Sequence, residues 1–172
     1  MKPYIFTIVI LFFTAHSIFA QANNSKTATA YRHTIYLEGL GAGGYGSFNY
    51  EYGYFQKGDL KLNARAGFST YMLTDFLHRF NPDIIFPLSA GLVYGDVHNL
   101  EIGLGQMFSS ISEINLETFK PHRVNRFSSF AIAGYRWQPK RWRVMVRLAY
   151  TPILQFNQRF QHWGGLSFGY KF

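Results

Sequence analysis

Residues 60–68 read LKLNARAGF, and the alternation in this stretch decides the fold class. Every second residue is apolar, and the residues between them are polar, charged or glycine. Successive side chains of a β-strand point to opposite faces of a sheet. A period of two therefore predicts a strand with one apolar and one polar face, rather than a helix.

The same alternation recurs in eight segments up to residue 172. They are residues 34–43, 47–55, 60–72, 84–94, 100–109, 127–137, 141–154 and 162–172. Each has about 9–14 residues, which suits a tilted strand that crosses a membrane. Short connections (56–59, 95–99, 138–140) alternate with longer ones (74–83, 111–126, 155–161), apart from a short first connection at 44–46. We therefore predict an all-β fold, an eight-stranded antiparallel up-and-down transmembrane β-barrel.

The two faces of these segments distinguish a membrane barrel from a soluble one. A soluble lipocalin-like barrel has its apolar face inside, whereas a membrane barrel has it outside. Here the apolar face carries large aromatic residues near the segment ends, as at a membrane interface. The polar face mixes charge with glycine, which suits a narrow lumen filled by side chains. We predict an interior polar network of the charged residues on this face: Glu38, Glu51, Lys61, Arg65, Glu101, Arg143, Arg147 and Lys171.

Composition and the first residues predict the compartment. The 172 residues are 19% aromatic and 15% charged, with no cysteine and a net charge of +8. Without cysteine, disulfides and thiolate metal sites are excluded. Residues 1–22 combine a basic start, the apolar stretch YIFTIVILFF and the sequence Ala20-Gln21-Ala22, the pattern of a signal peptide cleaved after Ala20 or Ala22. We predict a flexible lead-in over 23–33 and the barrel over 34–172, and export argues against nucleic acid as a partner.

Four stretches resemble a known family. They are YLEGLGAGGYGSFNYE (36–51), LEIGLG (100–105), GYRW (134–137) and the last strand, WGGLSFGYKF (163–172). Over nearly all of the chain after residue 22, the sequence resembles small eight-stranded outer-membrane β-barrels of the OmpX/OmpA type. The resemblance implies a location in the Gram-negative cell outer membrane but no particular activity. It also implies that Phe168, Tyr170 and Phe172 form a signal that the barrel-assembly machinery recognises.

The sequence contains no pattern typical of a catalytic, cofactor or metal site. A lipid A deacylase has a His-x-Ser arrangement, but none of His33, His78, His98, His122 and His162 has serine two positions later. The palmitoyltransferase type has an amphipathic helix before the barrel, and residues 21–33 have no apolar stripe. The glycine-rich residues 39–44 lack the Lys-Ser/Thr of a phosphate loop and predict a tight, bulged hairpin. We predict no catalytic residue, no cofactor and no metal.

The longer connections carry the residues that could contact a surface partner. Basic side chains beside aromatic ones could bind lipopolysaccharide phosphates, although a solvated rim without a partner fits equally well. These loop candidates are His78, Arg79, Lys120, His122, Arg123, Arg126 and Arg159. We expect a monomer in contact with outer-membrane lipid and lipopolysaccharide, with a plugged interior, no open pore and a structural or surface-interaction role. The alternatives are an outer-leaflet lipid A-modifying enzyme and a soluble periplasmic carrier.

Overall fold

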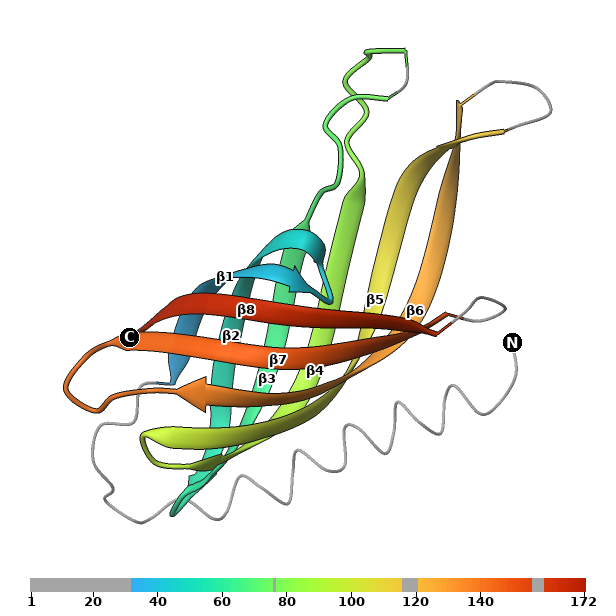
Figure 1. Ribbon diagram of the computed structural model, residues 1–172. Coiled ribbons are helices and arrows are strands. Elements are labelled where there is room, and N and C mark those ends of the chain that lie inside the picture. Colours follow the sequence, from blue (N-terminus) through green and yellow to red (C-terminus); the bar gives the residue numbers. More distant parts are fainter. Residues whose placement is uncertain (1–31, 76, 116–120, 156–159) are drawn as a thin grey trace. The chain divides into compact units, whose positions relative to one another are not determined.

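The computed structural model describes residues 32–75, 77–115, 121–155 and 160–172. The predicted signal peptide and nearly all of the predicted lead-in lie outside these ranges. Within them the chain forms eight strands (Figure 1), and no helix there is long and apolar enough to cross a membrane. The strands are β1 His33–Gly41, β2 Gly44–Lys57, β3 Leu60–Ser69, β4 Ile84–Gly95, β5 His98–Ile114, β6 Pro121–Trp137, β7 Val144–Gln155 and β8 Gln161–Lys171.

The eight strands form one closed antiparallel sheet, as the alternation predicts. Each strand pairs with its neighbours in the sequence, and β1 also pairs with β8, from Thr34↔Lys171 to Gly39↔Leu166. Closure removes the free edges of the sheet, so the backbone groups are bonded between strands even where no water is present. The predicted fold class is therefore confirmed.

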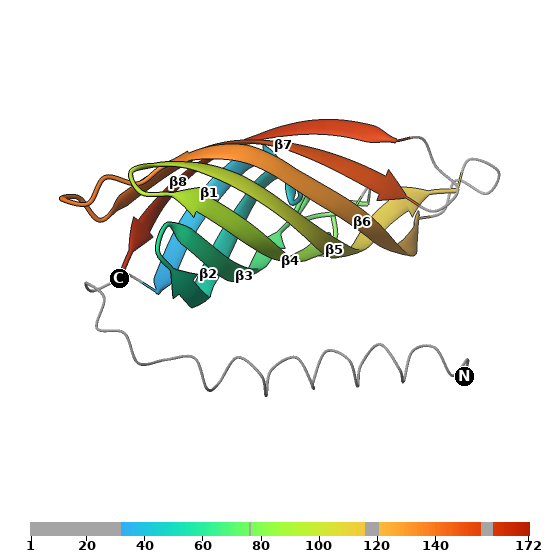
Figure 2. The same ribbon diagram turned by 90° about the horizontal axis from the view of Figure 1, so that it is seen from below.

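The connections separate the barrel into two ends. One end, here called the short-turn end, carries the turns after β2, β4 and β6 together with the start of β1 and the end of β8. The other, the long-loop end, carries residues 70–83 and the tip of the hairpin that β5 and β6 form. Figure 2 shows the three turns and the C-terminus gathered at one end, with the tip of that hairpin at the other.

The hairpin of β5 and β6 is longer than the sequence predicts. Most of the loop predicted over 111–126 is strand, because pairing continues from Ile111↔Val124 to Ile114↔Pro121. The hairpin extends beyond the neighbouring strands, so both of its faces can carry polar residues and the alternation weakens. His122, predicted in a loop, therefore lies on β6, opposite Glu113.

Two other predicted boundaries also change. Residues 70–72, predicted as the end of the third strand, belong to the loop after β3, which has its own bridge between Thr74 and Phe80. Residues 141–143, predicted at the start of the seventh strand, lie in the turn before β7.

The hairpin of β1 and β2 is tight, as predicted, but it is not bulged. Its register stays constant from His33↔Tyr52 to Gly41↔Gly44. Gly44 has a φ of 78°, a conformation that glycine adopts without strain. Its tip is fixed to β3, because the Ser69 hydroxyl donates to the carbonyl oxygens of Gly43 (2.7 Å) and Gly46 (2.5 Å).

Burial alternates along the strands and identifies the two faces of the barrel. In β3, Asn63 and Arg65 are buried, whereas Ala64, Ala66 and Phe68 are exposed. Large apolar side chains are exposed in the same way along all eight strands. Apolar residues outside and charged residues inside are the arrangement of a membrane barrel and the reverse of a soluble carrier.

Candidate functional site in the barrel lumen

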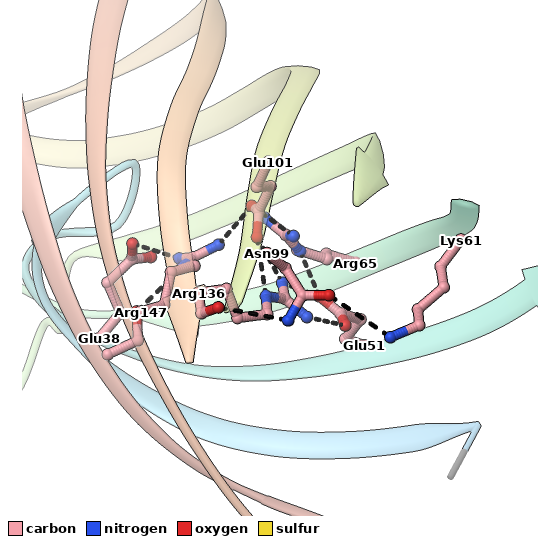
Figure 3. Close-up of polar contacts among 9 residues, drawn as sticks. Glu38, Glu51, Lys61, Arg65, Asn99, Glu101, Arg136 and Arg147 are labelled. Carbon is pink, nitrogen blue, oxygen red and sulfur yellow. Dashed lines mark hydrogen bonds and ion pairs between the residues drawn. The ribbon is translucent and has the colours of Figure 1, made fainter. Parts of the chain in front are cut away.

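Six charged side chains from six strands meet inside the barrel (Figure 3). Each is at most 7% exposed, and three carboxylates face three guanidinium groups. We call this set the lumen network. Its members are Glu38 on β1, Glu51 on β2, Arg65 on β3, Glu101 on β5, Arg136 on β6 and Arg147 on β7.

Glu51 binds two arginines through both of its oxygens. The Arg65 Nε lies 2.6 Å from Oε2 of Glu51. The Arg136 guanidinium approaches as a fork, with Nη1 2.6 Å from Oε1 and Nη2 2.7 Å from Oε2. Paired bonds between a guanidinium fork and a carboxylate fix orientation as well as providing energy.

Glu101 binds three arginines and is the most connected residue of the network. Its Oε1 lies 2.5 Å from Arg65 Nη2 and 3.1 Å from Arg147 Nη1. Its Oε2 accepts from Arg136, with Nη2 at 2.6 Å and Nε at 2.8 Å. Arg65 and Arg136 therefore each bridge Glu51 and Glu101.

Arg147 extends the network to β1 and β8. Its Nη2 lies 2.5 Å from Oε1 of Glu38, and its Nε donates to the Ser167 hydroxyl at 3.2 Å. The same guanidinium lies 5.0 Å from the centre of the Tyr36 ring, within range of a cation–π contact. Through these contacts Arg147 joins strands that lie at opposite ends of the sequence.

The lumen network is balanced in charge and fully buried, so its members depend on one another. A buried charge is tolerated only when it is paired and its hydrogen-bonding groups are satisfied. Removing one partner from a buried pair leaves an uncompensated charge, at a cost of about 3–5 kcal/mol. The network therefore requires all of its strands to be in place.

On the long-loop side of the network, the lumen contains a cluster of apolar side chains among buried serines and threonine. Ile85 and Met107 on β4 and β5, Phe130 and Ile132 on β6, and Ile153 on β7 form a buried cluster. Ala42 at the tip of the β1–β2 hairpin belongs to it, and Tyr71 and Trp163 pack against it. A cavity of about 10 Å³ remains between this cluster and the network, no larger than about one water molecule.

On the short-turn side, two lysines lie at the mouth of the lumen. The Lys61 Nζ is 3.5 Å from Oδ1 of Asn99, and the Lys171 Nζ donates to the Pro139 carbonyl oxygen at 3.1 Å. Both lysines were predicted as members of the interior network. They lie nearer the short-turn end than the three glutamates and the three arginines of the network.

One predicted network residue lies elsewhere, and one network residue was missed. Arg143 is exposed in the turn before β7, where its Nη1 donates to the Tyr170 hydroxyl at 3.2 Å. Arg143 is four positions before Arg147 and would share its inward face if the strand continued. It precedes β7, however, and so does not enter the lumen. Arg136 was missed because the inward face of β6 also carries Phe130 and Ile132, which conceal its polar character. The structure reveals its inward position, because Arg136 pairs with the inward-facing Arg147.

Two of the seven loop candidates, Arg123 and Arg126, hold the long-loop end together. Arg123 donates to Asn81 Oδ1 and to the Pro82 carbonyl oxygen at 3.0 Å, and Arg126 pairs with Glu113 at 2.6 Å. His122 is exposed on β6, and His78 and Arg79 are exposed in the loop after β3. Lys120 and Arg159 lie outside the described residues.

That loop is ordered by a carboxylate. The Asp75 Oδ1 accepts from the backbone N–H groups of Leu77 (2.9 Å) and Arg79 (3.0 Å). These hydrogen bonds, led by the one from Arg79, lower the pKa of Asp75. Hydrogen bonds from these N–H groups favour the charged form of Asp75.

Three strand histidines, His33, His98 and His162, are paired with tyrosines on the outer face. The Nδ1 atoms of His33 and His162 lie 2.6 and 2.5 Å from the hydroxyls of Tyr50 and Tyr150, and His98 contacts Tyr135 in the same way. Across the described part of the chain, no three His, Asp or Glu side chains are grouped as metal ligands would be. The histidine–tyrosine pairs were not predicted from the sequence.

The comparison with known proteins supports the fold through solved structures. No protein-family model and no curated protein matches the chain. Solved structures do match. The N-terminal β-barrel domain of Pseudomonas aeruginosa OprF shares 15% identity, with a TM-score of 0.56 over 81% of this chain and 95% of that one. The crystal structure of Ail, the attachment invasion locus protein of Yersinia pestis, shares 15% identity, with a TM-score of 0.57 over 81% of this chain and 95% of that one.

The chain has the fold of the small OmpX/OmpA-type outer-membrane barrels. A further match is the Yersinia pestis outer membrane protein Ail in a phospholipid bilayer nanodisc, with 14% identity and a TM-score of 0.51 over 81% of this chain and 98% of that one. The outward apolar belt requires a bilayer around the barrel. The fold and the belt are those of an outer-membrane barrel, and in such barrels the short turns face the periplasm and the long loops face outward.

Proposed function

We propose that the chain is a closed, non-conducting barrel that stabilises the outer membrane and holds a rigid surface outside the cell. The observation that carries the first part is the filling of the lumen. The lumen network crosses it, and the apolar cluster lies on the long-loop side of the network, with a cavity of about 10 Å³ between them. An eight-stranded barrel has an interior just wide enough for its own side chains.

Conductance measurements test this part of the proposal. The purified barrel, inserted into a planar lipid bilayer, should give no stable openings of large conductance. A pore-forming barrel studied in the same bilayers serves as the positive control. Stable, large openings of the wild-type protein would contradict the proposal.

The rigid outer surface is proposed because the loop after β3 and the hairpin of β5 and β6 are hydrogen-bonded to each other. Arg123 on β6 binds the loop at Asn81 and Pro82, and the buried Asp83 accepts a hydrogen bond from the Ser112 backbone N–H at 2.9 Å. Figure 1 shows the loop after β3 and the hairpin of β5 and β6 extending from the same end of the barrel. A fixed loop loses less conformational entropy when it binds a partner.

The fixed loop exposes apolar side chains beside basic ones. Leu73, Leu77 and Phe80 are 59%, 56% and 79% exposed, and His78 and Arg79 lie between them in the sequence. Such a surface supports an interaction role. Ail is described as an attachment protein, and one of its structures contains the heparin analogue sucrose octasulfate, at 15% identity and a TM-score of 0.56 over 81% of this chain and 96% of that one. Attachment is therefore the first activity to test.

Attachment can be measured with cells that produce the wild type or the variant L73S/L77S/F80S. We expect weaker attachment to surfaces or to neighbouring cells with the variant. A variant that changes only the charge, H78Q/R79Q, separates the apolar from the basic contribution. Heat-modifiable migration on gels shows whether equal amounts are folded. Unchanged attachment in both variants would contradict the interaction role and leave the structural one.

We also propose that the barrel has no enzymatic activity, since three of its strand histidines, His33, His98 and His162, bind tyrosines on the outer face. The alternative, a lipid A-modifying enzyme, predicts an acyl chain that is lost or gained only when the protein is present. Mass spectrometry of lipid A from cells with and without the protein distinguishes the two. We further propose that the barrel is a monomer that contacts lipopolysaccharide and is inserted by the barrel-assembly machinery, for which Phe168, Tyr170 and Phe172 remain the predicted signal.

A further inference from the structure

The charges of the chain are unevenly distributed along the barrel axis. The lumen network holds three acidic and three basic residues, so it contributes no net charge. The sequence of the long-loop end has five basic and four acidic residues, counting those outside the described ranges. The short-turn end has seven basic residues and two acidic ones, a net charge of +5. Nearly all of the excess charge from residue 32 onward therefore lies at one end.

Much of this charge at the short-turn end points away from the lumen. Lys61 and Lys171 are turned toward the lumen mouth, and Lys140 forms an exposed ion pair with Asp96 at 2.6 Å. The exposed basic residues besides Lys140 are Arg32, Lys57, Arg141 and Arg143, and the other exposed acid at this end is Asp59.

Arg141 and Arg143 lie in one turn with an exposed tryptophan between them. Trp142 is 56% exposed, and its ring lies edge-on to Trp137 at 6.3 Å. Arg143 is held against β8, because it donates to the Tyr170 hydroxyl at 3.2 Å and its carbonyl oxygen accepts from the Lys171 N–H at 2.7 Å. Tryptophan and tyrosine side chains lie at the headgroup level of a bilayer. We therefore expect the two guanidinium groups to lie at the depth of the lipid phosphates.

We propose that Arg141, Trp142, Arg143 and Tyr170 form a binding site for the headgroup of an anionic phospholipid in the periplasmic leaflet. A guanidinium presents a planar fork of donors that matches a phosphate group. The tryptophan ring beside it can pack against the upper part of the acyl chains. Basic residues near an anionic membrane surface raise binding by about fivefold each, and two of them raise it by more than tenfold.

The site contains its own fluorescent reporter. In the variant W137F/W163F, Trp142 is the single tryptophan, and quenching by brominated lipids measures which lipids surround it. The barrel would be refolded into phosphatidylcholine vesicles that contain either brominated phosphatidylglycerol or brominated phosphatidylcholine. Both leaflets then have the same composition, so the orientation of the protein does not matter.

We expect Trp142 to be surrounded preferentially by phosphatidylglycerol, by roughly tenfold over phosphatidylcholine, with a preference that decreases as salt is added. The same background with R141Q/R143Q should lose most of this preference. The matched control R79Q/R126Q removes two arginines from the long-loop end and should keep it. Gel migration shows that each variant is folded.

Four results would overturn the proposal. The first is equal quenching by the two lipids in the W137F/W163F protein. The second is an equal loss of preference in R79Q/R126Q, which would indicate a general effect of net charge. The third is a preference that survives R141Q/R143Q. A response of Trp142 to a soluble polyanion, without any lipid preference, would assign the turn to a different class of partner and would also reject this site.

Discussion

Two ion pairs join the same two strands of this barrel but lie in different surroundings. Glu101 on β5 and Arg136 on β6 are buried in the lumen, with side chains 0% and 2% exposed. Glu113 and Arg126, further along the same strands, are 38% and 28% exposed in the projecting hairpin. Both pairs have an N–O distance of 2.6 Å. Because residue types, strands and distances match, any difference in their contribution to stability must come from burial and from the number of partners.

The largest effect is expected from breaking the buried pair. Glu101→Ala leaves three buried guanidinium groups facing two carboxylates, and should lower the free energy of unfolding by about 3–5 kcal/mol. Urea unfolding of the barrel in lipid vesicles, followed by tryptophan fluorescence, measures this loss. A decrease below about 1 kcal/mol would mean that water or lipid headgroups reach the network.

The second prediction compares the coupling within each pair. For E101Q, R136Q and the double variant, the loss in the double variant should be smaller than the sum of the single losses, by about 1–3 kcal/mol. The same cycle with E113Q and R126Q should give a coupling near zero. Equal coupling energies in the two cycles would show that burial does not distinguish the pairs.

A smaller effect is expected from the exposed pair itself. Glu113→Ala should change the free energy of unfolding by less than about 1 kcal/mol, because solvent screens the pair. Raising the salt concentration should make the change caused by Glu113→Ala smaller still. The loss of unfolding free energy caused by Glu101→Ala should change little with salt. Urea unfolding at low and high salt provides both measurements.

The smallest effect concerns Asp75, an exposed carboxylate bound by backbone N–H groups instead of a cation. Its pKa is lower in the folded loop than in the unfolded chain, so its contribution is complete above the ordinary value of about 4 and is lost as the pH falls below it. The NMR amide signals of Leu77 and Arg79 should shift in this acidic range. Asp75→Asn should abolish the shift, and global unfolding should be unchanged.

The sequence predicted the barrel well because the fold depends on a repeated local signal. Apolar residues must face lipid along every membrane-spanning segment, so the period of two is present in all eight. Where that constraint ends, the prediction fails. In the projecting hairpin, both faces of Ile111–Ile114 can carry polar residues, and the strand was interpreted as loop.

The lumen could be predicted only in part, since its inward faces are mixed. Glu51 and Arg65 lie on strand faces whose other residues are polar or glycine. Their inward position therefore follows from the alternation of the strand. Arg136 shares its face with Phe130 and Ile132, which fill the apolar part of the lumen. Arg143 has the parity of Arg147, but only the structure shows that β7 begins after it. Which arginine bridges which glutamates is set by the register between distant strands.

The lumen network also bears on the order in which the barrel can be assembled. Its pairs join residues that are far apart in the sequence: 14 positions separate Glu51 from Arg65, 85 separate Glu51 from Arg136, and 109 separate Glu38 from Arg147. A sheet that has formed only β1 to β5 contains all three glutamates but a single arginine of the network. Its inner face would carry excess negative charge, which a bilayer does not tolerate. Stable residence in the membrane therefore has to wait for β6 and β7, so neutralisation of the lumen and closure of the sheet become one event.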